Sequence, residues 1–263
     1  MKFTKSMAVM VTALGLLAGG NANANHVPTV GLELMLLVDV SGSVDSTEYN
    51  LQKQGYVNAF NSSAVQDAIL ASQGGSIAVT YIEWSGNSQQ SQQVGWTLID
   101  SAVSSQAFAT ALAGVARAFS GQTAIQKAIN SQYSLFGTEV GGTDNGFASL
   151  RQVIDVSGDG ADNNSGSSLT GATGRNNALA AGVDAINGIA ILGEGGLATY
   201  YQNYVVGGAN GFYASAASFG TFSDAIERKL VREIRNVPEP ESLALVGLAL
   251  AGLALSRRRK SNA

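Results

Sequence analysis

The sequence predicts an α/β fold: a doubly wound, mostly parallel central sheet flanked by helices. Between residues 30 and 235, short apolar runs alternate with amphipathic runs, which is the pattern of buried strands and covering helices. Two of the apolar runs end in clusters of carboxylate and hydroxyl residues, as at the functional edge of such a sheet. The chain has 263 residues, enough to bury a full hydrophobic core.

The first half of the predicted domain begins with a strand over residues 33–38. The next helix is expected to start at Asp45, with Glu48 as its capping-box partner. The β-branched and aromatic run 77–84 and the alternating run 94–99 predict a hairpin-like pair of strands around a polar loop, residues 85–93. The residues expected on the buried face of the helix are Tyr49, Tyr56, Val57 and Phe60.

The second half continues the alternation. Residues 108–119 and 123–136 are predicted to form helices, and residues 152–156 a buried strand. A helix is expected near residues 175–186, followed by a strand over 189–192.

A final helix closes the predicted domain. Four apolar residues recur on one of its faces, which we expect to be buried: Phe222, Ile226, Leu230 and Ile234. Four charged residues are expected to point elsewhere: Glu227, Arg228, Arg232 and Glu233.

The N-terminal residues 1–24 have the layout of a secretory signal peptide. Lys2 and Lys5 precede an apolar stretch, and the small-residue pattern Ala22-Asn23-Ala24 follows it. We expect this signal helix to be cleaved after Ala24, which leaves an exported domain over residues 25–236.

Residues 237–263 carry a second signal. They contain Pro238-Glu239-Pro240, an apolar run and the basic cluster Arg257-Arg258-Arg259-Lys260. This order resembles the PEP-CTERM sorting signal of Gram-negative bacteria. The resemblance implies a hydrophobic helix held transiently in the inner membrane, cleavage by an exosortase-type peptidase, and an extracellular or cell-surface mature form. An ordinary C-terminal membrane anchor is the alternative.

Composition excludes several classes of function. The chain has no cysteine, which excludes disulfides, thiolate metal ligands and a cysteine nucleophile. The single histidine, His26, follows the expected cleavage point closely, so three-histidine zinc sites and serine–histidine–aspartate catalysis are excluded. Residues 25–240 contain nine Lys and Arg against eighteen Asp and Glu. Because binding to a phosphate backbone needs a basic surface, we expect no nucleic-acid partner.

The chemistry-bearing residues follow two predicted strands. Asp39, Ser41 and Ser43 come directly after the first strand, and Asp159 follows the strand at residues 152–156. These strand ends are neighbours in a doubly wound sheet, and Thr123 offers a further hydroxyl on the same edge. Such oxygen-only ligands suit Mg²⁺, with Mn²⁺ or Ca²⁺ as alternatives. If some of the protein ligands act through water, one coordination position of the metal stays open, and it can accept a carboxylate from another molecule.

These residues resemble the metal-ion-dependent adhesion site of the von Willebrand factor A (VWA) domain, and the resemblance covers roughly residues 30–235. Asp39-Val40-Ser41-Gly42-Ser43 matches the Asp-x-Ser-x-Ser element, while Thr123 and Asp159 match the separate threonine and second aspartate. It implies a Rossmann-like VWA fold in which Ser41, Ser43 and Thr123 contact the metal. Asp39 and Asp159 would act largely through water. Residues 154–160 and 229–234 resemble a bacterial branch of this superfamily.

One departure from the motif leaves two candidates for the second aspartate. Most relatives carry Thr-Asp-Gly or Ser-Asp-Gly where this chain has Ser157-Gly158-Asp159-Gly160, so either Asp155 or Asp159 could face the metal. Asp159 is favoured because Asp155 lies within the predicted strand, where a carboxylate needs a buried partner.

Metal-free alternatives exist for each element. Asp39, Ser41 and Ser43 could form a turn and helix cap, and Thr123 could be a helix N-cap. Residues 155–162 mimic the start of a calcium loop, but its twelfth position holds Gly166 instead of an acid. The three polar residues that follow are expected to be solvated: Asp162, Asn163 and Asn164.

We therefore expect a non-enzymatic, exported adhesion or interaction module. A divalent cation would capture a carboxylate on a partner protein or an acidic exopolysaccharide. The alternative is a metal-dependent hydrolase or phosphotransfer enzyme with Asp39 as nucleophile. Such enzymes usually carry a second acid two residues later, where this chain has Ser41.

Overall fold

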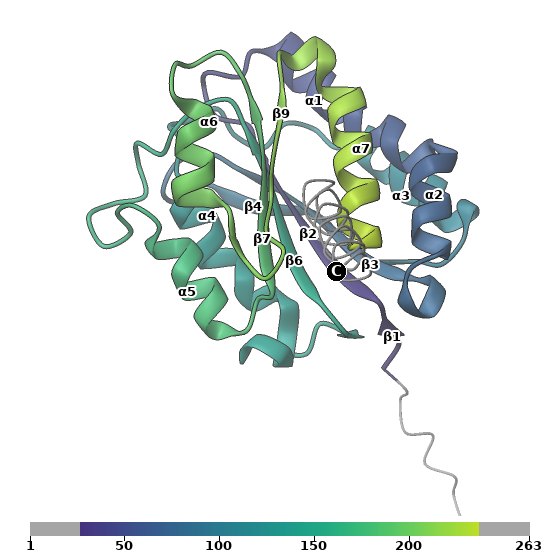
Figure 1. Cartoon of the computed structure of the whole chain (residues 1–263). Helices are drawn as coiled ribbons and strands as arrows, with labels where there is room; N and C mark the ends of the chain where they lie inside the picture. The colour runs from purple at the N-terminus through teal and green to yellow at the C-terminus, as the bar shows by residue number, and fades with distance from the viewer. Residues whose placement is uncertain (1–26, 237–263) are drawn as a thin grey trace, which may run out of the picture.

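The structure is a computed structural model that describes residues 27–236 (Figure 1). The predicted signal peptide, residues 1–24, and the predicted sorting signal, residues 237–263, lie outside the described residues. The central sheet contains seven strands, β2 (Leu32–Asp39), β3 (Ile77–Trp84), β4 (Gln90–Ile99), β6 (Gln152–Gly158), β7 (Ala185–Ile191), β8 (Gly207–Gly208) and β9 (Tyr213–Ala216). A separate parallel pair joins β1 (Thr29–Val30) to β5 (Ala148–Ser149).

The strand order is β4-β3-β2-β6-β7-β8, and β9 also pairs with β7. Strands β2, β3, β6, β7 and β9 run parallel, whereas β4 and β8 are antiparallel to their neighbours. The chain moves outward from β2 through β3 to β4 and then returns to the other side of β2 at β6. The predicted doubly wound, mostly parallel sheet is therefore confirmed, with its switch point between β2 and β6.

Helices cover both faces of this sheet (Figure 1). One face carries α1 (Ser46–Asn61), α2 (Ser63–Leu70), α3 (Ala102–Ala113) and α7 (Phe222–Arg235), and the other carries α4 (Ile125–Gln132), α5 (Thr173–Ala181) and α6 (Leu197–Tyr200). Shorter helical turns lie at Gln73–Gly75, Tyr133–Val140, Tyr201–Val205 and Phe219–Thr221. Within residues 27–236, no helix combines the length and apolar character needed to cross a membrane.

Strand β2 forms the centre of the core, and all eight of its residues are buried. Leu34 and Leu36 pack in the cluster under α1 and α7, while Met35 and Leu37 pack in the cluster under α4 and α5. A strand covered on both faces needs a nearly continuous apolar sequence, which β2 has. This burial holds the carboxyl end of β2 in a fixed position.

The start of α1 agrees with the sequence prediction. The Asp45 side chain accepts hydrogen bonds from the backbone N–H groups of Thr47 and Glu48, and the Glu48 side chain accepts one from the Asp45 N–H. This reciprocal capping box is confirmed. The four apolar residues predicted to face the core are all buried: Tyr49, Tyr56, Val57 and Phe60.

Two predictions around the third helix are wrong. Helix α3 spans Ala102–Ala113 instead of 108–119, because Ser101 and Ser104 form a capping box at its start and Gly114 ends it. The residues that follow, 115–124, form a loop that reaches the carboxyl end of β2. The predicted polar loop 85–93 is also shorter, since β4 already begins at Gln90.

Two further helices are shorter than predicted. Helix α4 begins at Ile125 and ends at Gln132, where the chain tightens into a 3₁₀ segment. Helix α5 ends at Ala181 because Gly182 adopts a left-handed conformation with φ of 119°. Strand β7 then starts at Ala185, several residues before the strand predicted at 189–192.

Helix α7 buries the face that the sequence predicts, since its four recurring apolar residues are all buried. The prediction for Glu233 is wrong. Its side chain faces the sheet, and the residue is only 2% exposed. Lys229, one turn earlier, is equally buried and forms an ion pair with Glu233. A partner of opposite charge lets two charged residues occupy a position that hydrophobicity alone would deny them.

Candidate metal site

The candidate site lies at the carboxyl ends of β2 and β6. Asp39 is the last residue of β2, and its Oδ1 accepts a hydrogen bond of 2.7 Å from the Ser41 N–H. This turn brings the Ser41 and Ser43 hydroxyl oxygens to 3.2 Å from each other. Ser43 Oγ donates to Asp159 Oδ1 at 2.8 Å, although the two residues are far apart in sequence. The structure thus brings four of the five predicted ligand residues into one hydrogen-bonded chain.

The second carboxylate oxygen of Asp39 is unusual. Asp39 is fully buried, and its Oδ2 has no hydrogen-bond partner. Burial raises the pKa of Asp39 to about 7; hydrogen bonds from Ser41 lower it, and the negative charge of Asp159 raises it. Because a buried acceptor without a donor is costly, this oxygen is the position in the site where a cation would be most stabilising.

Gly158 lets β6 approach this carboxylate closely. A Cβ atom at this position would lie 2.8 Å from Asp39 Oδ2 and 2.7 Å from the hydroxyl of Tyr201. The Tyr201 hydroxyl is also buried and has no hydrogen-bond partner. The glycine that departs from the common motif therefore makes room for these two oxygens at the end of the strand.

Thr123 lies on the same edge, in the loop before α4. It is 5% exposed, and its Oγ1 would lie 3.7 Å from a Cβ atom built on Gly160. The backbone of Thr123 is tied to the loop after β6, because its N–H donates to Asn163 Oδ1 and its carbonyl accepts from the Asn163 N–H. The N-cap position of α4 belongs to Ala124, so the helix-cap alternative for Thr123 is wrong.

Arg117 holds the loop that carries the two serines. One guanidinium nitrogen, Nη2, donates to three backbone carbonyls of the loop, those of Val40, Ser41 and Val44, at 2.7–2.9 Å. In addition, the Gly42 N–H donates to the carbonyl of Gly121 at 2.7 Å. Arg117 lies in the segment predicted as helix, so its role in fixing the site was missed by sequence reasoning.

Two further carboxylates lie near Asp159. Burial raises the pKa of Asp159, the hydrogen bond from Ser43 opposes this, and the charges of Glu48 and Glu194 add to it. Glu194 follows the carboxyl end of β7, and its Oε2 accepts a hydrogen bond of 3.0 Å from the Ala161 N–H. The carboxyl ends of parallel strands lie at one edge of the sheet, and Glu194 follows the end of β7. The same reasoning that located Asp39 and Asp159 could therefore have located Glu194.

These side chains border an open hollow of about 510 Å³. Its lining includes Ser43, Thr123, Asp159, Gly160 and Glu194. Neither Asp39 nor Ser41 is part of this lining, because both residues are buried. A ligand entering the hollow would therefore meet hydroxyls and acidic oxygens before it met the buried carboxylate.

Asp155 and Asp159 have different surroundings, because Asp155 lies within β6 and Asp159 follows its end. Asp155 Oδ1 lies 2.5 Å from Lys229 Nζ, and both side chains are fully buried under α7. Asp155 thus has the buried partner that a carboxylate within a strand needs. Asp159, by contrast, is hydrogen-bonded to Ser43, so it is the aspartate that lies beside the serine turn.

The polar residues after Asp159 form a loop in which Asn163 is exposed, as the sequence predicts, whereas Asp162 and Asn164 are half-buried. Asp162 Oδ2 accepts a hydrogen bond from the Gln126 N–H at the start of α4, and its Oδ1 accepts one from the Ser165 N–H. Asn164 Oδ1 accepts one from the Asn87 N–H. These residues tie three loops together around the site, because their side chains satisfy backbone donors that no regular ladder reaches.

The available donors are all oxygen atoms. Within residues 27–236, no three His, Cys, Asp or Glu side chains are grouped so that they could hold a metal ion. A cation at this edge would therefore depend on the hydroxyls of Ser41, Ser43 and Thr123 together with the two aspartates. Hard divalent cations accept such mixed oxygen donors, so the donor set fits a cation of the magnesium or calcium class.

A family model described as a protein of unknown function, DUF1194, matches residues 29–238, which is most of the chain. The chain belongs to the DUF1194 family. A second model, the PEP-CTERM protein-sorting motif, matches residues 236–260 and confirms the sorting signal predicted from the C-terminal sequence. This DUF1194 protein is exported through the membrane to the cell surface, which is where that motif directs a protein. No curated protein sequence matches the chain.

Solved structures show that this DUF1194 domain has the VWA fold. Proximal thread matrix protein 1 from the mussel byssus, with a zinc-occupied MIDAS motif, matches at a TM-score of 0.57 and 15% identity, over 79% of this chain and 49% of that one. The pilus adhesin SpaC from Lactobacillus rhamnosus GG matches at a TM-score of 0.54 and 18% identity, over 79% of this chain and 30% of that one. A von Willebrand factor type A protein from Catenulispora acidiphila matches at a TM-score of 0.50 and 11% identity, over 78% of this chain and 43% of that one. The chain thus spans at most about half the length of these proteins.

Proposed function

We propose that this protein is an extracellular interaction module that binds a partner carboxylate through a divalent cation. The observation that carries the proposal is the buried Asp39 Oδ2, which has no donor and belongs to a turn whose Ser43 hydroxyl borders an open hollow. A cation there would neutralise the two aspartates and keep an open position toward the solvent. The partner would be a protein or an acidic exopolysaccharide.

The protein's own residues have separate roles in this proposal. Ser41, Ser43 and Thr123 would supply hydroxyl ligands, and Asp39 and Asp159 would supply negative charge. Asp39 also shapes the turn through its bond to the Ser41 N–H, and Arg117 holds the same turn from the other side. The cation, when bound, supplies positive charge and a free coordination position.

The similar structures support a cation-binding interaction module, but they do not identify the partner of this protein. One of them is a matrix protein whose MIDAS motif holds zinc, and another is a pilus adhesin. At the cell surface, the domain can meet a partner protein or an acidic exopolysaccharide. The burial of Asp39 argues against the enzymatic alternative, because a nucleophilic carboxylate must reach its substrate.

Calorimetric titration of the folded protein with Mg²⁺, Mn²⁺ and Ca²⁺ tests the proposal. We expect the wild type to bind at least one of these ions, and both Asp39→Ala and the double variant Ser41→Ala/Ser43→Ala to bind it at least about tenfold more weakly, a loss of about 1.4 kcal/mol. Ser167→Ala is a matched control, since Ser167 is an exposed serine outside the site. Folded wild-type protein that binds none of the three ions would refute the proposal, and phosphatase activity dependent on Asp39 would favour the enzymatic alternative.

A further inference from the structure

A cluster of charged side chains lies buried on the opposite face of the sheet from Asp39. Lys229 on α7 is within 2.5 Å of two acids, Asp155 Oδ1 on β6 and Glu233 Oε1 on α7. Asn187 on β7 completes the cluster, because its Nδ2 donates to Glu233 Oε1 at 2.8 Å. The Lys229, Asp155 and Glu233 side chains are all fully buried.

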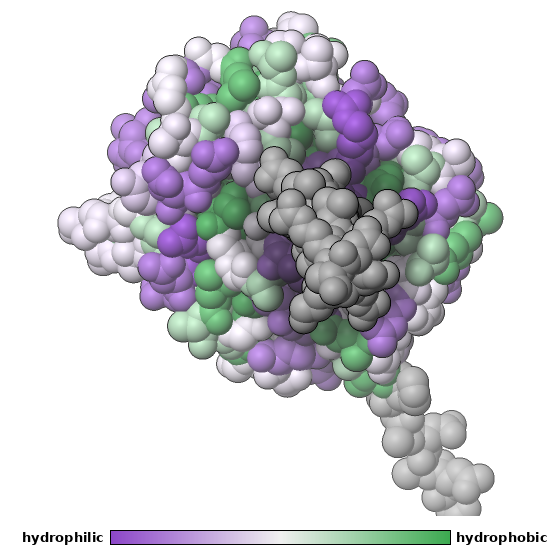
Figure 2. All heavy atoms as spheres, viewed as in Figure 1, coloured by the Kyte–Doolittle hydropathy of each residue, from purple (hydrophilic) through white to green (hydrophobic). Residues whose placement is uncertain are grey.

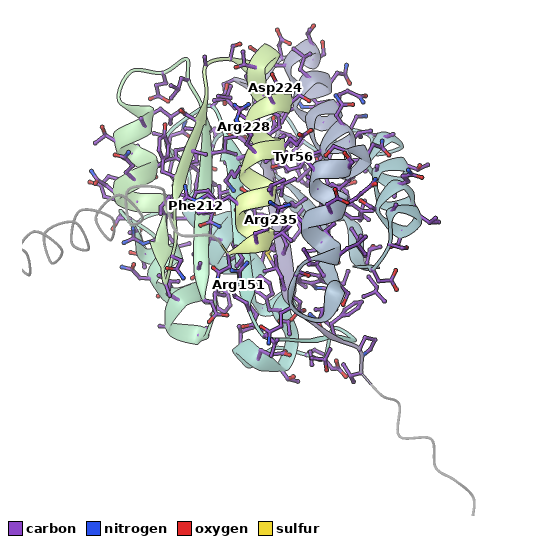
Figure 3. All side chains as sticks on the ribbon, turned by 45° about the vertical axis from the view of Figure 1, so that its right-hand side comes forward. Tyr56, Arg151, Phe212, Asp224, Arg228 and Arg235 are labelled. Atoms are coloured by element: carbon purple, nitrogen blue, oxygen red, sulfur yellow. The ribbon has the colours of Figure 1, made fainter. Side chains whose placement is uncertain are left out.

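Two aromatic residues lie near this cluster. Figure 3 shows Tyr56 and Phe212 on opposite sides of α7. The Phe212 ring centre lies 5.4 Å from Lys229 Nζ, and the charge of Asp155 acts on the fully buried Tyr56. Charges in such surroundings are expensive because water cannot solvate them.

The contact between Lys229 and Asp155 does not have hydrogen-bond geometry. Their charged atoms lie 2.5 Å apart, yet neither oxygen of Asp155 has a hydrogen-bond partner. Lys229 Nζ does form a hydrogen bond with Glu233 Oε1. The amine therefore lies against the Asp155 carboxyl group while it is oriented by Glu233.

Glu233 is the acid of the cluster whose pKa is raised. Burial raises its pKa to about 8, and the nearby charge of Asp155 adds to the effect, while Lys229 and Asn187 oppose it. Its second oxygen, Oε2, is buried without a partner and can carry the proton. The cluster thus contains one amine, one carboxylate to react with and one acid that can transfer protons.

We propose that Lys229 and Asp155 become joined by an intramolecular amide bond that links α7 to β6. The Lys229 ammonium first passes a proton to the Asp155 carboxylate, which leaves a neutral amine and a carboxylic acid. Lys229 Nζ then attacks Cγ of Asp155. Glu233 accepts the proton released by the amine and returns one to the departing hydroxyl, so the C–O bond breaks and one water leaves. No oxidant or cofactor is consumed, and Glu233 is regenerated.

Two features of the structure favour this step. The reaction replaces a buried ion pair by a neutral amide, which removes the cost of keeping two charges away from water. A cavity of about 20 Å³, lined by residues that include Arg151, Asn187 and Glu233, adjoins the cluster. Since about 10–15 Å³ suffices for one water molecule, the cavity can hold the water that is released.

The bond would connect the last helix of the domain to a central strand of the sheet. Exported proteins commonly obtain such a connection from a disulfide, but this chain has no cysteine. An amide between Lys229 and Asp155 would restrict the unfolded chain in the same way.

Peptide mapping of the protein recovered after export tests the proposal. Trypsin cannot cleave after an acylated lysine, so we expect a branched peptide of residues 152–175 joined to residues 229–232, lighter than the two separate peptides by one water molecule. The bond is also expected to survive boiling in detergent and reductant. Separate, unmodified peptides from the folded wild type would overturn the proposal, and so would a loss of water located at other residues.

Two variants separate the amide from an ordinary ion pair. Lys229→Arg keeps the positive charge but removes the amine, and we expect it to yield only unlinked peptides. Glu233→Gln keeps the size and the contact with Asn187 but cannot transfer a proton, so we expect amide formation to slow by about 100-fold or more. Equal amounts of branched peptide in Glu233→Gln and wild type would contradict the role given to Glu233. Cation binding at Asp39 is independent of all these outcomes.

Discussion

At the scale of single residues, the same chemical group has different properties in different surroundings. Asp39 is fully buried and lacks a partner for one oxygen, whereas Asp159 is partly exposed and accepts a hydrogen bond from Ser43. Asp155 lies against a buried lysine. Burial raises the pKa of Asp39 to about 7, far above the value of about 4 for an aspartate in water. The protonation of this one group therefore links cation binding to pH.

We predict that cation affinity rises with pH and levels off above about pH 7, because the cation must displace a proton from Asp39. Without cation, the folded state holds this proton more tightly than the unfolded chain does. Its stabilising contribution is thus fully present below about pH 4 and is lost as pH rises through about 7. Titrations with Mn²⁺ between pH 5 and 8, and melting temperatures in chelator over the same range, measure both effects. An affinity that does not change between pH 5 and 8 would contradict this prediction, and Asp39→Asn should remove most of the dependence.

At the scale of secondary-structure elements, the site depends on how closely β6 approaches β2. The two strands pair in parallel, with Val38 opposite Ser157, so the residues that follow them meet at the same edge. Gly158 has no side chain there, and this leaves room for Asp39 Oδ2 and the Tyr201 hydroxyl. The loop over residues 115–124 closes the edge through Arg117. The elements thus define the geometry, while their termini carry the chemistry.

We predict that Gly158→Ala destabilises the domain by about 1–3 kcal/mol, because the new methyl group would overlap two buried oxygens. Cation affinity should fall as well, since Asp39 must shift. Tyr201→Phe removes one of the two clashing oxygens, so the double variant Gly158→Ala/Tyr201→Phe should recover part of the lost stability. Urea unfolding of the single and double variants measures this coupling. Additive effects of the two substitutions would show that the clash with Tyr201 is unimportant.

At the scale of the whole molecule, the chain combines a sorting signal for export with a domain that contains no cysteine. The sorting motif over residues 236–260 begins directly after α7, so processing would leave the folded domain intact. On the face shown in Figure 2, outside the grey atoms, hydrophobic residues occur in small groups between hydrophilic ones. The candidate site lies at the carboxyl edge of the sheet, where strand ends from both halves of the fold meet.

We predict that the mature protein ends near Pro238-Glu239-Pro240 and lacks the basic cluster at its C-terminus. Cleavage at this position would separate the folded domain from the apolar run that follows it. Mass spectrometry of the protein recovered from the cell surface measures the new terminus and, with it, the predicted loss of residues 1–24. An intact C-terminal sequence Arg257–Ala263 in the mature form would favour a permanent membrane anchor instead.

Much of the fold could be predicted from the sequence because the relevant interactions are local. The apolar runs of β2, β3 and β6 identify buried strands, and the pair Asp45 and Glu48 identifies a helix start, since each signal lies within a few neighbouring residues. The Asp-x-Ser-x-Ser turn is also local, and the rule that parallel strands end at one edge adds the remaining candidate ligands. The C-terminal signal was predicted in the same local way, and the sorting-motif match confirms it.

Other properties were decided only by tertiary structure. Asp155 contacts Lys229, far along the chain, while Asp159 lies beside Ser43, and the burial of Glu233 accompanies the contact with Lys229. The loop at Arg117 looks helical by composition, but the carbonyls it binds belong to a distant turn. Sequence periodicity records how a segment faces the core as a whole. It does not identify the charged residue that a buried side chain will contact, because the free energy of a buried charge depends on atoms contributed by other parts of the fold.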